Sequence, residues 1–541
     1  MADAVRAVAL TGAPSVRHGE GAKNRRLDVQ GLRAVAVLMV VAFHAGLPLP
    51  GGFVGVDVFF VISGFVITGM LRREWLATGG IRFGAFYARR FKRLTPALAL
   101  TVSVTMLLSA LMLSPFGPQQ IAAKTAVGAM LLAANFVIAG STGQYFDAPA
   151  ETNPLLNTWS LSVEEQFYLA FPALLLIGWL TGRRLQRPVG SAILLVAIVA
   201  AFSFALAIIG QEVSGLGEAE YLFGFYSPFT RFWEFAAGAL LTLAWSVATP
   251  SRQVATAMAL IGFAMLALSL WVIAGTSQVP GPWTLLPVGG TLLLLAAGKQ
   301  PANGGSRLLA TRPLVRVGDW SYSLYLWHWP FVVFARILWP SSGLALVLAA
   351  VASLIPAVAS YRWVEQPIRA LTSLRGRRFA MLVAVTLAVP LTIAGVVGIA
   401  GPMGWSPEGL KDAAHDRVEE HAGRVRGCHI SQAFDRQAIS GCEWNADARG
   451  RPIYLVGDSN AEQFSEAAIG AGAILNRPVW IFTGSSCPLV DGLDLTVAAT
   501  KSEFVSDPIP STAFDHCQQY AEEVVRWLRT APPGDVFIAA N

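Results

Sequence analysis

Charged residues are scarce in this sequence. Only 14% of its 541 residues are Asp, Glu, Lys or Arg, whereas soluble proteins carry about 25%. Hydrophobic residues make up 54%. This balance excludes a wholly soluble protein and predicts a chain built largely for the lipid bilayer. The net charge of +6 is therefore taken as a guide to membrane orientation, and no nucleic-acid partner is expected.

The beginning of the chain lacks an apolar run. Residues 1–26 contain five basic side chains and nothing that matches the core of a secretory signal peptide. We therefore expect residues 1–30 to form a cytoplasmic tail and the first membrane segment to direct targeting.

Apolar stretches long enough to cross a bilayer recur through residues 31–401, which we predict to be one membrane domain. Eleven crossings are expected, at 32–47, 53–71, 94–114, 160–181, 190–210, 231–247, 254–275, 281–298, 318–338, 342–361 and 379–401. A twelfth stretch, 125–140, is shorter and contains Asn135. If it re-enters on the outer side, every basic cluster falls in the cytoplasm, and the outer loops 141–158 and 211–228 contain no Lys or Arg. The sequence therefore predicts a re-entrant segment and an exported C-terminal domain.

Cysteine is rare and confined to that exported part. The four cysteines are Cys428, Cys442, Cys487 and Cys517. An even number in an exported domain indicates disulfides, and we favour the short-loop pairing Cys428–Cys442 with Cys487–Cys517 among three possible pairings. A zinc site is the alternative, but the spacing contains no C-x-x-C pair, so no metal is expected.

The exported part alternates between strand and helix patterns. After a charged linker at 402–427, the domain at 428–541 is expected to contain strands and helices in turn. The strands are predicted at 453–456, 479–482 and 536–540, and the helices at 461–472 and 518–530. Such alternation predicts an α/β fold with a parallel sheet.

Several ionisable residues lie inside the predicted membrane segments. Arg33 and His44 share a face of the first crossing, about 16 Å apart along its axis. Arg90 and Arg93 share a helix face at the start of the third crossing and could grip phosphate groups, such as those of coenzyme A. Ionisable residues in a membrane are functional candidates, although topology anchors and a hydrogen-bonded core histidine are the alternatives.

Three further segments combine aromatic and polar residues. They contain Glu164 and Glu165 within WSLSVEEQFY, Arg231 with Glu234, and His328 within SYSLYLWHWP. Each segment fits either an aromatic belt with an internal ion pair or the lining of a polar cavity.

A Gly457-Asp458-Ser459-Asn460 turn follows the first predicted strand of the exported domain. A serine there, at the start of a helix, lies near free backbone N–H groups that help an oxyanion form. Ser459 is therefore a candidate nucleophile. An ordinary helix cap is the alternative.

Taken in order, eight segments resemble the acyltransferase-3 family fused to an SGNH-hydrolase-like domain, over roughly residues 25–541. The segments are 26–44, 51–68, 86–98, 157–169, 231–241, 321–330, 361–369 and 453–464. The resemblance implies a bacterial inner-membrane O-acyltransferase. Its donor would be cytoplasmic acetyl-CoA. Its acceptor would be an extracytoplasmic polysaccharide or lipid-linked glycan, such as lipopolysaccharide O-antigen, peptidoglycan or exopolysaccharide.

The family motifs carry over onto particular residues. Arg33 and His44 match an Arg-x10-His motif, and Arg90 with Arg93 matches Arg-x-x-Arg. The remaining site residues implied by the resemblance are Ser459 as nucleophile with Asp458, Glu165 as a catalytic carboxylate, and Gly484 and Asn541 as oxyanion donors.

The sequence departs from the family pattern at two places. Asn460 stands where many fused relatives have His, and the Asp-x-x-His block expected after the third strand is not found before Asn541. The Asp412 to His415 match lies in the linker, ahead of Ser459. We therefore expect either a truncated sequence or a domain without its usual base, which would leave Ser459 poorly activated.

The resulting hypothesis places acyl-CoA on Arg90, Arg93 and Arg33, with His44 as general base or transient acyl carrier. The acyl group would then pass to Ser459 or directly to a sugar. Two other classes remain open: a transporter or flippase with a glycan-binding module, and an outer domain acting as a carbohydrate esterase.

Overall fold

The computed structural model describes residues 26–541 with several gaps. These gaps are 142–149, 214–219, 245–248, 276, 278, 372–375, 401–402, 404–420, 431–440, 485–510 and 540–541. The expectations for the cytoplasmic tail, most of the linker, Asp412, His415, Cys487 and Asn541 thus lie outside the described residues. The chain divides into two compact units, Met1–Gly401 and Pro402–Asn541.

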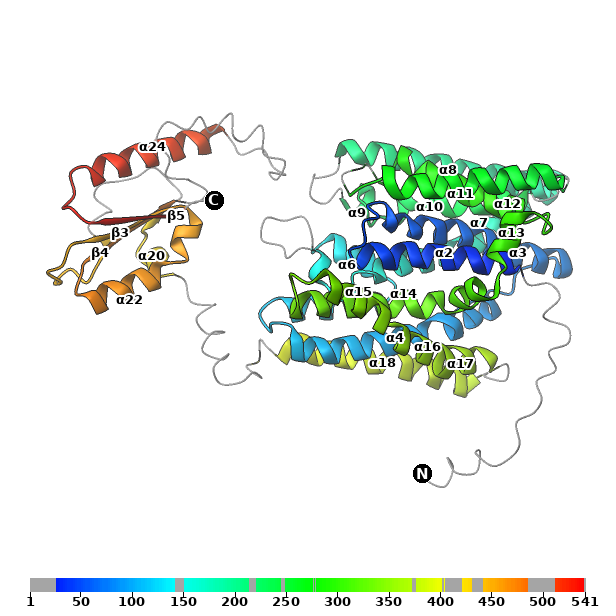
Figure 1. Cartoon of the computed structure of the whole chain (residues 1–541), viewed down its shortest axis with the longest axis horizontal. Coiled ribbons are helices and arrows are strands. Elements are labelled where there is room, and N and C mark those ends of the chain that lie inside the picture. Colours follow the sequence, from blue (N-terminus) through cyan, green and yellow to red (C-terminus); the bar gives the residue numbers. More distant parts are fainter. Residues whose placement is uncertain are drawn as a thin grey trace, which may run out of the picture. The chain divides into compact units, whose positions relative to one another are not determined.

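The first unit is helical, and its long helices run side by side (Figure 1). They are α2 (Leu27–His44), α3 (Gly55–Thr78), α4 (Phe83–Met112), α5 (Pro118–Met130), α6 (Ala134–Ala139), α7 (Thr158–Arg184), α8 (Pro188–Val213), α9 (Glu220–Phe223), α10 (Pro228–Leu243), α11 (Arg252–Val272), α12 (Leu285–Ala297), α13 (Gly304–Leu309), α14 (Arg312–Leu338), α15 (Gly343–Ala352), α16 (Leu354–Ser360), α17 (Gln366–Ala370) and α18 (Gly376–Ala400).

Each of the eleven predicted crossings coincides with helix in this unit. Within the described residues, eight helical stretches are long and apolar enough to cross a membrane. The other three predicted crossings fall on α10, α12 and α14. Helices α10 and α12 have only 16 and 13 residues, and α14 carries several charged side chains. A multi-pass helical membrane domain is therefore confirmed, while the number of crossings stays a prediction.

The twelfth apolar stretch is broken into α5 and α6. The break falls at Leu131–Ala133, where Leu132 has a positive φ of 61°. The 13 residues of α5 reach about 20 Å, which is short of the roughly 30 Å hydrocarbon core. A broken pair of short helices fits the expected re-entrant segment.

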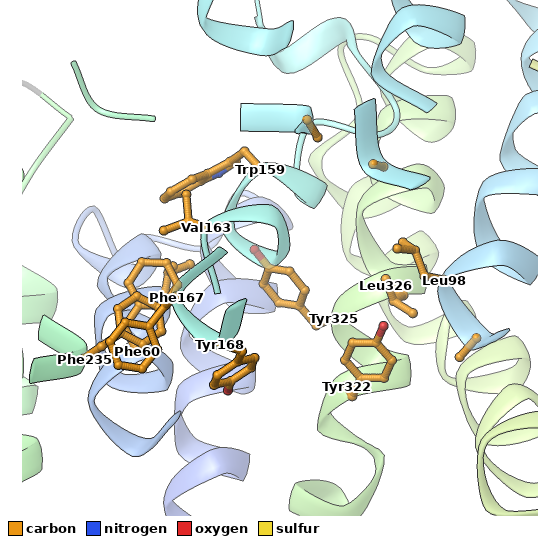
Figure 2. Packing of buried hydrophobic residues seen from close by; sticks show 14 of the residues in the cluster. Phe60, Leu98, Trp159, Val163, Phe167, Tyr168, Phe235, Tyr322, Tyr325 and Leu326 are labelled. Atoms are coloured by element: carbon orange, nitrogen blue, oxygen red, sulfur yellow. The ribbon is translucent and has the colours of Figure 1, made fainter. Parts of the chain in front are cut away.

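Small residues bring α3 and α10 into close contact. A Cβ on Gly64 would lie 1.9 Å from the Phe235 carbonyl oxygen, and one on Gly238 would lie 2.0 Å from that of Val61. Larger side chains would therefore force the two helices apart. Phe60 and Phe235 stack beside these contacts with ring centroids 4.4 Å apart, as Figure 2 shows.

The second unit is an α/β domain. Its strands are β1 (His429–Ile430), β2 (Glu443–Trp444), β3 (Ile453–Gly457), β4 (Val479–Gly484) and β5 (Asp535–Ala539), and its helices are α20 (Ala422–Val425), α21 (Ser459–Glu462), α22 (Ser465–Leu475) and α24 (Ser511–Leu528). The parallel strands run in the order β1-β4-β3-β5, and β2 pairs antiparallel with β4. Helices α22 and α24 cover opposite faces of the sheet (Figure 1). The three predicted strands and their parallel pairing are confirmed.

Part of the predicted disulfide pattern is confirmed. Cys428 and Cys442 are bonded, and both sulfur-bearing side chains are buried in the core of this domain. Because Cys487 lies outside the described residues, its pairing with Cys517 stays a prediction.

We expect Gly457→Ala to destabilise this domain by at least about 2 kcal/mol. Gly457 ends β3 with φ at 146°, and an added Cβ would lie 1.9 Å from the Ala539 carbonyl oxygen of β5. Hydrogen exchange of β3–β5 amides in the full chain would measure the loss. Gly470→Ala in α22 is the matched control, since its Cβ meets nothing within 4 Å and should be neutral or stabilising.

Candidate functional site

A cavity of about 720 Å³ lies among α2, α3, α4, α7 and α14 of the membrane unit. We call it the first cavity. Its wall gathers charged side chains from helices that are far apart in the sequence: Arg33, Arg90, Arg93, Arg369, Asp319, Glu164 and Glu365. The structure therefore brings together the three arginines that the motifs singled out.

Arg90 is held in place by its neighbours. Its Nη2 atom donates to Glu165 Oε1 at 3.2 Å, and its guanidinium carbon lies 3.8 Å from the centre of the Tyr168 ring. Glu165 thus neutralises Arg90 instead of lining the first cavity. The neighbouring Glu164 lines it and accepts hydrogen bonds from Ser63 at 2.5 Å and from Tyr168.

Arg33 and Arg93 are different, because neither forms an ion pair with a described residue. The Nε atom of Arg93 is buried without a hydrogen-bond partner. The nearby Glu365 instead accepts a hydrogen bond from Ser323 at 3.1 Å. The guanidinium groups of Arg33 and Arg93 are thus available to an anion in the first cavity, and phosphate oxygens suit their planar donor geometry.

If the first cavity holds a phosphate-bearing donor such as acyl-CoA, Arg93→Ala should raise the KM for that donor roughly 10- to 100-fold, since a hydrogen bond to a charged group contributes about 1.5–3 kcal/mol. Donor titration of full-length protein in membranes would measure this. Arg183→Ala is the matched control, because Arg183 stacks 4.2 Å from the Trp75 ring near a helix end and does not line the first cavity. Equal effects of the two substitutions would indicate a simple topology anchor.

A second cavity of about 370 Å³ lies at the other end of α2, and His44 lines it. Its wall is rich in aromatic rings, together with a few polar groups. The aromatic residues are Phe43, Phe53, Trp159, Phe225, Tyr226, Tyr325 and Trp329. Glu151, Asn157 and Arg336 add polar groups to the wall. Aromatic faces next to hydrogen-bonding groups suit a ligand with both apolar and hydroxyl surfaces.

The tautomer of His44 follows from a chain of hydrogen bonds. His328 Nδ1 lies 3.1 Å from the Leu324 carbonyl oxygen, which can only accept, so this nitrogen carries the proton. His328 Nε2 is then the acceptor for His44 Nδ1, 2.9 Å away. The remaining atom, His44 Nε2, therefore has a free lone pair. Trp329 also fixes the His44 ring by an edge contact at 4.4 Å.

A buried charge cluster borders the second cavity. Arg231 Nη1 lies 2.8 Å from Asp57 Oδ1 and 3.2 Å from Glu234 Oε1. All three residues are at most 1% exposed, and Glu234 Oε2 has no hydrogen-bond partner. The predicted Arg231–Glu234 ion pair is thus present, and Asp57 joins it from α3.

In the second unit, the predicted serine lies at the carboxyl edge of the sheet. Ser459 starts α21 and is partly exposed, while the Asp458 carboxylate caps the helix by accepting from Asn460 N at 2.7 Å. The expected helix at 461–472 is instead two helices, broken at Gln463 and Phe464. Because α21 is a single turn, its dipole gives an oxyanion less support than the sequence suggested.

Gly484 ends β4 and pairs with Ile430 of β1 in the register of the sheet. A buried group at this edge escaped the sequence analysis. His429 Nδ1 lies 2.9 Å from Thr483 Oγ1 and 3.2 Å from Glu462 Oε2. Burial lowers the pKa of His429, although Glu462 opposes that shift.

The sequence also missed several residues of the membrane site. His328, Glu164 and Arg231 lie in segments that had been noted, but no role was assigned to them. Tyr168 and Tyr325 lie in the same noted segments, and Glu365 lies in the family-like segment 361–369, but none of them was singled out; all three line the first cavity. Their aromatic and acidic side chains look ordinary for the ends of membrane helices, so only the fold reveals them.

Comparisons with known proteins cover both units. Residues 26–362 match the family described as "Acyltransferase domain", and residues 427–541 match "SGNH domain (fused to AT3 domains)". O-acetyltransferase OatA of Staphylococcus aureus is 31% identical over 356 residues, which is 63% of this chain and 57% of that protein. Peptidoglycan O-acetyltransferase OatA of Listeria monocytogenes is 30% identical over 359 residues, or 63% and 55% of the two chains.

The chain thus spans little more than half the length of these curated relatives. No solved structure shows a significant match.

Proposed function

Because the chain belongs to the acyltransferase-3 family and carries an SGNH domain, we propose that it transfers an acetyl group from acetyl-CoA to a glycan hydroxyl. The donor side would be the cytoplasm and the acceptor side would lie outside a bacterial inner membrane. The names of the two relatives support acetyl as the group, and one of them supports peptidoglycan as the acceptor.

One observation carries the proposal: a cavity lined by arginines that form no ion pair with a described residue and a cavity with a histidine lone pair lie at opposite ends of the same helix, α2. The first suits the phosphates of coenzyme A through Arg33 and Arg93. The second suits general-base chemistry at His44 Nε2. The concentration of Lys and Arg in the predicted inner loops supports a cytoplasmic first cavity.

The transfer step would then proceed as follows. His44 Nε2 takes the proton from the acceptor hydroxyl, and the hydroxyl oxygen attacks the thioester carbonyl carbon. As the new C–O bond forms, the C–S bond breaks, and the imidazolium returns the proton to the leaving sulfur. His328 keeps the His44 ring in the tautomer that this step needs.

Ser459 defines a second route. The acetyl group would pass first to a protein hydroxyl and then to the glycan through an acyl-enzyme. The partial exposure of Ser459 at the sheet edge supports a role in contact with substrate. The same exposure would suit a carbohydrate esterase, which would release free acetate instead.

Labelled acetyl-CoA supplied to the cytoplasmic face of sealed inverted vesicles tests the proposal. Label should appear in lumenal glycan and should fall in Arg93→Ala when acetyl-CoA is supplied below its native KM. Ser459→Ala separates the routes: retained label indicates direct transfer, and lost label indicates an acyl-enzyme. Absence of label with full-length protein and acceptor would refute the proposal, and movement of glycan without acetyl-CoA would favour a flippase.

A further inference from the structure

The first and second cavities meet at a common wall. Of the described residues, Val56 of α3 and Tyr325 of α14 line both cavities. Since these are the described residues that the two linings share, their side chains lie at the boundary between the cavities. A group that moves from one cavity to the other would pass beside them.

Tyr325 is fixed at this boundary by hydrogen bonds to the start of α7. Its hydroxyl lies 2.6 Å from Ser160 Oγ and donates to the Asn157 carbonyl at 3.2 Å. Asn157 Nδ2 donates in return to the Tyr325 carbonyl at 2.6 Å. Figure 2 shows the Tyr325 hydroxyl directed at the α7 segment that carries Trp159.

These contacts come from both sides of the boundary. Ser160 lines the first cavity and Asn157 lines the second. Phe59, which also lines the first cavity, packs edge-on against the Tyr325 ring with centroids 6.2 Å apart. Tyr325 is only 5% exposed, so its ring is packed into the boundary while its hydroxyl is bonded to α7.

The proposed chemistry requires this boundary to open. Arg33 and His44 lie about 16 Å apart along α2, since they are eleven helical steps apart. A donor whose phosphates bind near Arg33 must place its carbonyl carbon about 3–3.5 Å from an acceptor oxygen beside His44. The thin pantetheine arm of coenzyme A would have to extend past Tyr325 to do so.

We propose that Tyr325, latched to Ser160, is the gate between the two cavities and limits the size of the acyl group that is transferred. This inference rests on the proposed function. The thioester passes the ring, the C–O bond to the acceptor forms and the C–S bond breaks, with the proton moving through His44 to sulfur. A longer acyl chain must fit beside the ring as well, so Tyr325 is a specificity-determining residue.

Competition between acetyl-CoA and hexanoyl-CoA tests the size limit. In Tyr325→Ala, we expect the ratio of hexanoyl to acetyl transfer to rise at least about tenfold over the native chain. Tyr325→Phe and Ser160→Ala keep the ring but remove the hydrogen bond between residues 325 and 160, so a smaller rise in this ratio is expected. Tyr87→Ala is the matched control, because its hydroxyl donates to the Leu169 carbonyl at 2.8 Å and it lines neither cavity.

An unchanged ratio in Tyr325→Ala, with acetyl transfer still measurable, would overturn the gate. A rise of equal size in Tyr87→Ala would also overturn it, since the effect would then come from general loosening.

A second experiment does not depend on catalysis. Phe53 lines the second cavity, so Phe53→Cys places a thiol beyond the gate. In sealed vesicles, a small membrane-impermeant thiol reagent should modify residue 53 from one face only, as read by mass spectrometry of that peptide. With Tyr325→Ala added, modification should occur from both faces. One-sided modification in the double variant, or two-sided modification in Phe53→Cys alone, would refute the gate even if no acyl transfer were detected.

Discussion

Replacing His44 with alanine is expected to abolish acyl transfer, with a rate loss of at least about 10³-fold. The reason lies in the hydrogen bonds that run from the Leu324 carbonyl through His328 to His44. These hydrogen bonds commit His44 Nδ1 to donation and leave Nε2 as the basic atom facing the second cavity. No other described histidine lines this cavity.

The measurement is incorporation of labelled acetyl into glycan by the full-length chain. His421→Ala is the matched control, because this half-exposed histidine of the second unit contacts Glu466 instead. Transfer by His44→Ala at the native rate would mean that the base lies elsewhere.

His328 is expected to act as a positioning residue for His44. His328→Gln keeps an oxygen that can accept from His44 Nδ1, whereas His328→Phe removes the acceptor. The Gln variant should therefore retain at least about tenfold more activity than the Phe variant. Equal losses in the two variants would indicate a packing role only.

The elements of the fold could be read from the sequence because their signals are local. Ile453–Gly457 and Val479–Gly484 are short apolar runs between polar turns, and they form neighbouring parallel strands as predicted. Eight of the apolar helical stretches among the described residues are likewise long enough to cross a bilayer. The local pattern predicted the structure less well after Ser459, because Gln463 and Phe464 interrupt the helix that was expected at 461–472.

The arrangement of the site depends on contacts that no local pattern encodes. His44 and His328 are separated by 284 positions and meet only because α2 packs along α14. Glu164 and Glu165 illustrate a different limit. Adjacent helical residues point about 100° apart, so one lines the first cavity and the other binds Arg90. The sequence shows that the pair is polar but cannot set the rotation of α7.

Replacing Arg231 with methionine is expected to destabilise the membrane unit by about 3–5 kcal/mol. The substitution removes the cation and leaves Asp57 and Glu234 facing each other in a site that is at most 1% exposed. Their charges would then lack the counter-ion that Arg231 supplies. Thermal unfolding of the full chain in detergent, together with its yield, would measure the loss.

The loss of stability in Arg231→Met should come from the uncompensated carboxylates and not from lost packing volume. Adding Asp57→Asn and Glu234→Gln to Arg231→Met is therefore expected to recover most of the stability, because neutral amides need no counter-ion. Arg336→Met is the matched control, since Arg336 also lines the second cavity but forms no ion pair with a described residue. If the triple variant were as unstable as Arg231→Met alone, the stacking of Arg231 over Phe225 at 4.5 Å would be the dominant contribution instead.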